Sequence, residues 1–145
     1  MPVNGFVVRI ALVGLALLAG VWLAFGIRSV RLTDDADNVL PQVQRHPVAP
    51  EVVDSALSEY GKAERLSPDQ TPLIKQGQLL WAAGRKEEAR AAARKATDAE
   101  PENLQAWELS YLVADKTTPQ RRLARVELLK LNPWFLYVLT RRSPT

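Results

Sequence analysis

The chain has 145 residues, 47% of them hydrophobic, and a formal net charge of +3 from 19 basic and 16 acidic residues. This length corresponds to one ordinary domain, and the lack of cysteine excludes disulfides and thiolate metal sites. Arg9, Arg28 and Arg31 are the only charged residues before Asp34, so the rest of the chain carries equal numbers of basic and acidic residues. The high isoelectric point therefore does not indicate a nucleic-acid-binding protein, which would carry a basic face.

The first predicted element is the apolar run of residues 10–27, which contains no charge. At about 1.5 Å per helical residue it would extend roughly 27 Å, close to the hydrocarbon thickness of a bilayer. It predicts a transmembrane helix within an N-terminal segment of residues 1–31, with Arg9 reaching the headgroups. The alternative is a signal peptide cleaved near residues 24–26, but the run is long and its start is weakly basic.

Small residues recur at every fourth position of this helix, at Ala16, Gly20 and Ala24. Such a stripe lets another transmembrane helix approach closely, although alanine and glycine are also common in membrane helices without this role. The expected localisation is the plasma membrane, as a single-pass protein. Basic residues on the two flanks are nearly balanced, so the side occupied by the rest of the chain stays undetermined.

Residues 32–49 are predicted to be a juxtamembrane connector. Asp34, Asp35 and Asp37 could suggest a divalent-metal cluster, but directly after a membrane helix they are more typical of a solvated exit and a helix cap. His46, the only histidine, precedes a proline and is expected to be an exposed loop residue. Neither a phosphate-binding glycine loop nor a nucleophile elbow occurs, so no catalytic, metal or cofactor site is predicted.

Helical spacing of apolar residues continues through residues 50–133, with proline or glycine at the boundaries. Thr71 and Thr118 each precede a proline and are expected to cap the helices that begin there. Strand-like alternation is almost absent, so the predicted fold class is all-α. The expected helices are 50–66, 72–84, 85–99, 102–114 and 119–131.

Proline stops recur at Pro68, Pro101 and Pro133, about 33 residues apart. A period near 34 is typical of helix-turn-helix repeat arrays. Residues 70–103 resemble one tetratricopeptide repeat, the segment after them resembles a second, and residues 50–68 resemble only the second helix of a preceding one. The residues that carry the resemblance are Gly77, Leu80, Gly84, Ala89, Ala93, Ala96, Pro101 and Trp107.

The resemblance implies a short solenoid of about two to two and a half repeats over residues 50–133, in which the small residues let neighbouring helices pack closely. Fewer than about three repeats usually need caps or a partner. Residues 134–145 are predicted to form a C-terminal cap and basic tail, with the apolar run 134–139 over the open end. Alternatively this run docks on a partner or on the membrane interface, with Arg141 and Arg142 at the headgroups.

A solenoid of this kind presents a groove along the first helix of each repeat. Each candidate residue there could instead pack against a neighbouring helix. Ile74 and Gln78 depart from the lysine and asparagine arrangement with which some family members clamp a C-terminal carboxylate, so that function is not implied. The candidate partner-binding residues are Thr71, Ile74, Lys75, Gln78, Trp81, Gln105, Glu108 and Leu112.

The sequence therefore predicts a non-catalytic, membrane-anchored scaffold or accessory subunit of a larger membrane protein assembly. In architecture it is similar to small anchored repeat proteins of bacterial cell envelopes. The predicted partners are an integral membrane protein or complex and the lipid bilayer, and not nucleic acid or metal. The alternative is a freestanding membrane-tethered recruiter that binds a soluble protein or peptide in the groove.

Overall fold

The structure, a computed structural model, describes residues 5–46 and 48–135, and only the backbone of residues 5–11, 29, 32 and 35. All regular structure in these residues is α-helical, which confirms the prediction of an all-α fold. The helices of this part of the chain are α1 (Gly5–Asp37), α2 (Leu40–Arg45), α3 (Pro50–Leu66), α4 (Thr71–Ala82), α5 (Lys86–Ala99), α6 (Leu104–Val113) and α7 (Pro119–Leu131).

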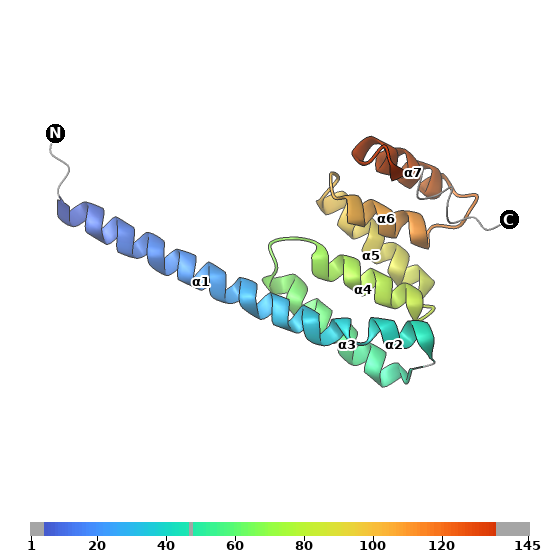
Figure 1. Ribbon diagram of the computed structural model, residues 1–145, viewed down its shortest axis with the longest axis horizontal. Helices are drawn as coiled ribbons and strands as arrows, with labels where there is room; N and C mark the ends of the chain where they lie inside the picture. Colours follow the sequence, from blue (N-terminus) through green and yellow to red (C-terminus); the bar gives the residue numbers. More distant parts are fainter. Residues whose placement is uncertain (1–4, 47, 136–145) are drawn as a thin grey trace.

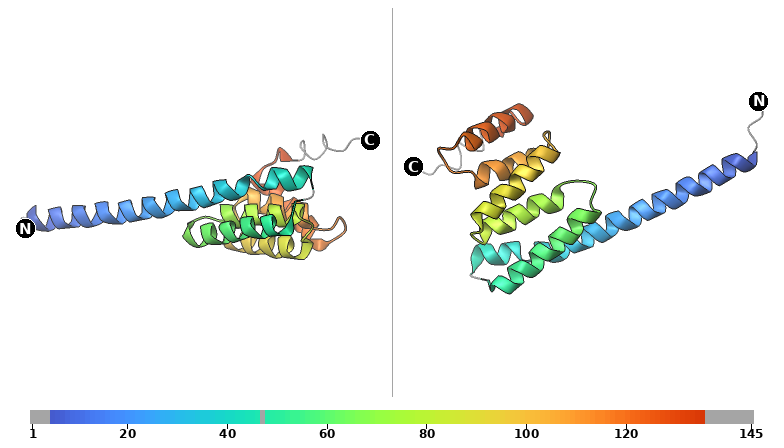
Figure 2. Two further views of the ribbon diagram at one scale, coloured as in Figure 1. Left: turned by 90° about the horizontal axis from the view of Figure 1, so that it is seen from below. Right: turned by 180° about the vertical axis from the view of Figure 1, so that it is seen from behind.

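Helices α3 to α7 form a stack in which each helix packs on the next one along the chain (Figure 1). The end of α1 packs on α3, so the stack consists of three helix pairs: α1 with α3, α4 with α5, and α6 with α7. Helices α4 and α6, the first members of successive pairs, also contact each other. The two ends of the stack are therefore the α1–α3 pair and α7, which lie far apart in Figure 1 and in the right-hand view of Figure 2.

The N-terminal helix differs from the prediction. Among the residues that the structure describes, no helix is both long and apolar enough to cross a membrane. The predicted transmembrane helix over residues 10–27 is therefore wrong. The apolar run is one part of the longer α1, which carries exposed arginines from Arg28 onward and continues to Asp37, past the expected boundary at residue 31. Its last turns belong to the stack, where Thr33 and Ala36 are buried.

The expected connector is largely folded. Helix α2 occupies six of its residues and contacts α4 and the end of α1. Val39, Leu40, Val43 and Val48 pack against the main core of the stack. No flexible linker therefore separates α1 from the other helices within the described residues.

The alanine-rich face of α5 lies in the middle of the stack. Ala89, Ala92, Ala93 and Ala96 are all buried, and α5 contacts α4 on one side and α6 on the other. Gly77 of α4 lies in the same close contact, since a Cβ atom there would be 2.5 Å from Cδ2 of Leu109 and 3.3 Å from Cβ of Ala92. Small side chains therefore set the spacing of these three helices.

Glycine also determines where α4 ends. Gly84 has a φ of +78°, a conformation that glycine adopts without strain. Its N–H donates to the carbonyl of Trp81 (3.1 Å), and the N–H of Arg85 donates to the carbonyl of Leu80 (2.9 Å), which is the Schellman pattern. This chain reversal aligns α4 and α5 as neighbours.

The two expected threonine caps differ from each other. Thr118 accepts a hydrogen bond from the N–H of Arg121 (3.4 Å) and caps α7. The expected cap at Thr71 is wrong, because α4 already begins at this residue and no side chain caps it from Gln70. Instead, the carboxylate of Asp69 accepts the N–H of Thr71 (2.9 Å).

Candidate interaction surfaces

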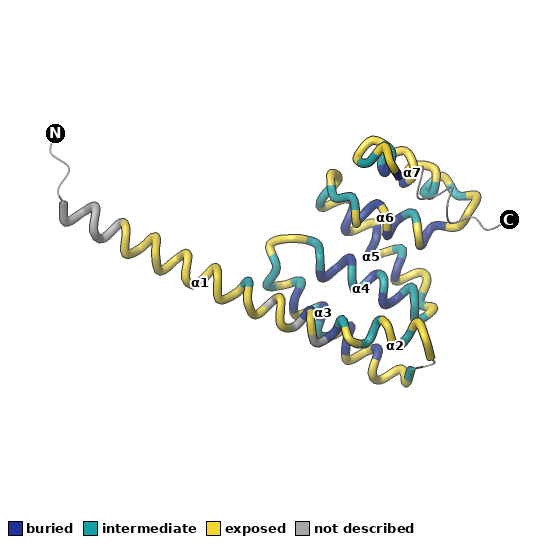
Figure 3. The backbone as a smooth tube through the Cα atoms, in the orientation of Figure 1, coloured by how far each residue is buried: buried dark blue, intermediate teal, exposed yellow. Residues whose placement is uncertain are grey.

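The most exposed apolar surface lies on α1, in residues 12–27, which we call the apolar arm. The arm projects from the stack and is exposed along its length (Figure 3). Its large apolar side chains are between 50 and 70% exposed, and their positions follow no single helical face, so they point to every side of the helix. They are Leu12, Val13, Leu15, Leu17, Leu18, Val21, Trp22, Leu23, Phe25 and Ile27.

The predicted small-residue stripe belongs to the arm. Ala16, Gly20 and Ala24 are exposed and share one side of α1. A Cβ atom at Gly20 would meet nothing within 4 Å. The stripe is thus free to contact another molecule as far as the described residues are concerned.

A polar junction holds the end of α1 against the stack. The hydroxyl of Tyr60, on α3, donates to Oδ1 of Asp37, the last residue of α1, at 2.7 Å. The ammonium of Lys75, on α4, donates to the other carboxylate oxygen of Asp37. Burial, together with the Asp37 carboxylate, raises the pKa of Tyr60 well above its usual range, so its hydroxyl remains a donor. Three helices meet at this carboxylate.

The structure divides the predicted groove residues into two sets. On α4, Ile74 is buried in the core, and Lys75 is engaged by Asp37. Trp81 packs partly against the core, and the ammonium of Lys86 lies 5.9 Å from its ring centroid. Thr71 and Gln78, also on α4, are partly buried.

On α6, by contrast, Gln105, Glu108 and Leu112 are exposed on one face. The α4 part of the predicted groove is therefore mostly engaged within the fold, whereas the α6 part is free in the described structure.

The residues that carry the repeat resemblance are mostly internal. Trp107 is buried, and its indole N–H donates to the carbonyl of Pro101 at 2.7 Å. Gly77 lies at the contact with Leu109, and Gly84 at the turn. The buried members of the set are Gly77, Leu80, Ala89, Ala93, Ala96 and Trp107.

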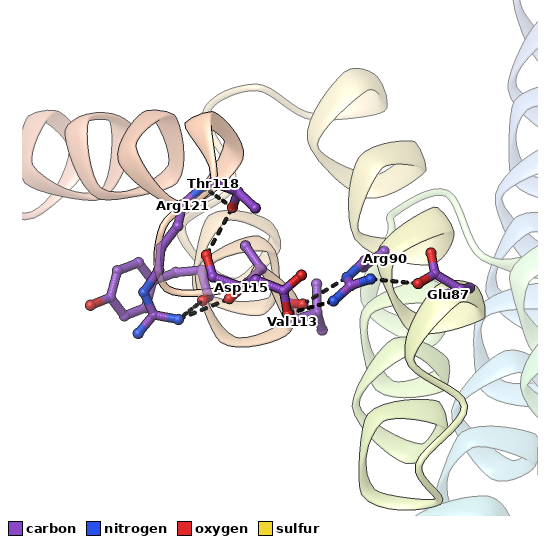
Figure 4. A network of polar contacts seen from close by, with 8 residues as sticks. Glu87, Arg90, Val113, Asp115, Thr118 and Arg121 are labelled. Atoms are coloured by element: carbon purple, nitrogen blue, oxygen red, sulfur yellow. Dashed lines mark hydrogen bonds and ion pairs between the residues drawn. The ribbon is translucent and has the colours of Figure 1, made fainter.

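Two arginines that the sequence analysis did not single out cover the end of α6 (Figure 4). Arg90, from α5, donates to the carbonyl of Val113 (3.2 Å) and pairs with Asp115 (2.7 Å). Arg121, from α7, donates to the carbonyls of Tyr111 and Ala114, both at 3.0 Å. These carbonyls lie at the C-terminal end of α6, where backbone carbonyls have no partner within the helix, so the arginines have a structural role.

The predicted C-terminal cap can be followed only at its start. Phe135 is buried and meets the ring of Tyr111 edge-on, at 5.9 Å between centroids, whereas Trp134 is exposed. The rest of the run, residues 136–139, lies outside the described residues, as do Arg141 and Arg142. Whether the run covers the end of the stack stays a prediction.

The residues that could suggest a metal site or acid–base chemistry have different surroundings in the structure. Asp34 is exposed, Asp37 is engaged by Tyr60 and Lys75, and His46 is exposed beside α2. Among the described side chains, no group of three or more histidines and acids could hold a metal ion.

Comparisons with known proteins add no family. No protein-family model matches the chain, and neither a curated protein nor a solved structure does. The resemblance to tetratricopeptide repeats therefore remains a prediction from the residues that carry it.

Proposed function

We propose that this protein is a non-catalytic accessory subunit of a membrane-associated protein assembly, which it joins through the apolar arm and holds through its helix stack. The supporting observation is the arm itself, with ten large apolar side chains at least half exposed. Covering each of them would contribute roughly 1 kcal/mol or more. An exposed apolar surface of this extent is typical of an interaction site.

The distribution of these side chains indicates the kind of surroundings that the arm needs. A helix that binds one surface carries an apolar stripe, whereas a helix that is apolar all round is typical of apolar surroundings on every side. No charged residue lies between residues 12 and 27, and the first two on the side of the stack, Arg28 and Arg31, are exposed. Apolar helices of a membrane-associated partner provide such surroundings, and the basic residues beside the arm suit the phosphate headgroups of the membrane with which that partner is associated.

A docked arm would also position the stack. α1 is one continuous helix of 33 residues, about 50 Å long, and its end is held by Tyr60 and Lys75 through Asp37. The orientation of the arm is thereby transmitted to α3 and α4 without a hinge. We infer that the protein presents its stack at a defined place relative to the partner that covers the arm.

The test compares two variants with the wild-type chain, each extracted from its source membrane fraction in a mild detergent through a C-terminal tag. Leu18→Gln/Trp22→Gln alters the arm, and Leu112→Gln alters an exposed leucine of α6. Native gels and mass spectrometry identify what travels with each protein. We expect stoichiometric integral membrane proteins with the wild-type chain and Leu112→Gln, and their loss from the arm variant.

Other outcomes would decide against the proposal. A wild-type chain that migrates as a lone monomer would overturn it. Loss of a soluble partner from Leu112→Gln, with the arm variant unaffected, would instead indicate the recruiter function and a binding surface on α6.

A further inference from the structure

We propose that opposite ends of the helix stack bind each other in different copies of this chain, so that the protein assembles head to tail. One end is the outer face of α7, formed by Arg122, Leu123, Arg125 and Val126, which we call the basic ridge. The other is a hollow between the end of α1 and α3, which we call the acidic hollow. This inference does not depend on the function of the apolar arm.

The basic ridge is the side of α7 that faces away from the stack. Ala124 and Leu128 are buried on the inner side against α6, whereas Leu123 and Val126 are 47 and 49% exposed. The guanidinium groups of Arg122 and Arg125 are exposed and form no ion pair or hydrogen bond with any described residue. They differ in this from the neighbouring Arg121, which is engaged by carbonyls of α6.

The acidic hollow has a volume of about 390 Å³ and lies at the opposite end of the stack. Buried alanines Ala36 and Ala56 line it together with Val39, and Val52 is 41% exposed at its edge. Its charged residues are Glu51 and Glu59, both acidic. Glu51 has no ion pair within the described residues, and Glu59 pairs only with the exposed Lys62 (2.6 Å).

The packing pattern within the chain shows how the two ends fit. The second helix of each pair packs on the first helix of the next pair, as α3 does on α4 and α5 on α6. α7 is a second helix with no such successor among the described residues, and α1 is a first helix with no such predecessor. Placing α7 of one copy against the α1–α3 pair of the next copy continues this packing of a second helix on the next helix pair.

Charge selects the head-to-tail arrangement over the symmetric ones. Contact between ridge and hollow brings Arg122 and Arg125 near Glu51 and Glu59, and buries Leu123 and Val126 against apolar side chains. Two ridges or two hollows in contact would place like charges together. Because the contacting surfaces differ, the assembly is heterologous and forms a ring or an open row.

The lack of native cysteine allows a direct test. Single-cysteine chains Val52→Cys and Val126→Cys are purified in full length in a mild detergent and treated with a short bifunctional thiol reagent, alone and mixed. We expect a crosslinked dimer at least tenfold more abundant in the mixture than in either chain alone. A crosslink within one variant alone would indicate a symmetric contact, and no crosslink would indicate no contact; either result overturns the proposal.

Charge reversal gives the second test. Arg122→Glu/Arg125→Glu in the Val126→Cys chain should reduce the crosslink by roughly tenfold, and Glu51→Lys/Glu59→Lys in the Val52→Cys chain should restore it. Arg94→Glu, an exposed reversal on α5, is the control that should have no effect. If the mixture of the two chains that together carry all four charge reversals does not form the crosslink again, the pairing of these charges is refuted.

Two controls distinguish head-to-tail binding from contacts made elsewhere on the chain. The first control labels Val126→Cys with a monofunctional thiol reagent in the monomeric fraction of the chain. If the cysteine is not labelled there, the ridge is covered by the chain itself, and the proposal fails. If Leu18→Gln/Trp22→Gln abolishes the crosslink, the copies meet through their arms. That result would refute head-to-tail binding and leave the proposed function standing.

Discussion

Replacing Gly77 by alanine tests whether close approach of α4 to α5 and α6 holds the stack together. The added Cβ would lie 2.5 Å from Cδ2 of Leu109 and 3.3 Å from Cβ of Ala92, and the first distance is far shorter than a normal carbon–carbon contact. Leu109 is 1% exposed, so its side chain has little room to turn away. The change must therefore shift a buried side chain or separate two helices.

Two opposing effects determine the magnitude. Alanine is favoured over glycine in a helix interior by about 1 kcal/mol. Overpacking a tight core by one methyl group costs about 1 to 3 kcal/mol. Because the contact is severe and Leu109 is confined, we expect the cost to prevail and the free energy of unfolding to fall by about 1–2 kcal/mol.

Gly61→Ala is the matched control. Gly61 lies inside α3, and a Cβ atom there would meet nothing within 4 Å, so only the helix-propensity gain applies. We expect this variant to be more stable than the wild-type chain by up to about 1 kcal/mol. Urea unfolding followed by circular dichroism at 222 nm, with all chains in the same mild detergent, measures both changes.

The double variant Gly77→Ala/Leu109→Ala shows whether the contact itself is responsible. If the clash with Leu109 causes the loss, the two substitutions are less destabilising together than the sum of their separate effects. A Gly77→Ala chain as stable as Gly61→Ala would refute the reasoning, because it would show that the three helices are not closely packed at this position.

Three further predictions concern the junction, the turn and the arm. Tyr60→Phe removes the hydrogen bond to Asp37 and should lower the free energy of unfolding by about 1–2 kcal/mol. Because the folded-state pKa of Tyr60 is raised, its contribution to stability is complete below the unfolded-state pKa, and the free energy of unfolding should fall as pH rises above about 10. Tyr60→Phe should weaken this pH dependence. Identical slopes of the free energy of unfolding against pH for the two chains, between pH 9 and 11, would contradict the role given to Tyr60. Gly84→Ala should cost about 1–2 kcal/mol, since alanine is strained at a φ of +78°, and an unchanged urea midpoint would contradict this. At Gly20 nothing in the described chain opposes a side chain, so Gly20→Leu should change the free energy of unfolding by no more than about 0.5 kcal/mol. If a partner helix packs on the stripe with Ala16 and Ala24, the variant should co-purify less of that partner. Undiminished recovery of the partner would show that the stripe is not a contact.

Elements bounded by local signals could be predicted from the sequence. α3 ends at Leu66, just before Ser67 and Pro68, and α7 covers residues 119–131 as expected. Gly84 stands where a positive φ is needed, and this requirement is itself local. Proline and glycine act on their own backbone, so their effects are visible without knowledge of distant contacts.

Elements that depend on distant contacts could not be predicted. The last turns of α1 were expected to be a solvated connector, but the residues that bind Asp37 are 23 and 38 positions away in the sequence. α2 has six residues, too few to be stable alone, and it is held by packing against α4. A short polar segment carries no local sign of such partners.

The same limit applies to the interaction surfaces. Periodicity placed Ile74, Lys75 and Gln105 on helices, but it could not show which side of each helix meets a neighbour. Ile74 is in the core, Lys75 is bound to Asp37, and only Gln105 is exposed. The apolar run of α1 was visible in the sequence, but its continuation into the stack was not, and this continuation gives α1 a different structural role from that of a separate membrane segment.

The arm and the ends of the stack point in different directions, and this has a consequence for their combined action. The arm leaves the stack to one side, whereas its two ends are α7, which carries the basic ridge, and the α1–α3 pair, which carries the acidic hollow (Figure 1). Head-to-tail copies would therefore present several arms to one partner surface, and linked contacts bind more tightly than single ones. Arg122→Glu/Arg125→Glu, which leaves the arm intact, should then weaken retention in the assembly by roughly tenfold or more. Retention equal to that of the wild-type chain would show that each arm acts alone, even if the crosslinks form.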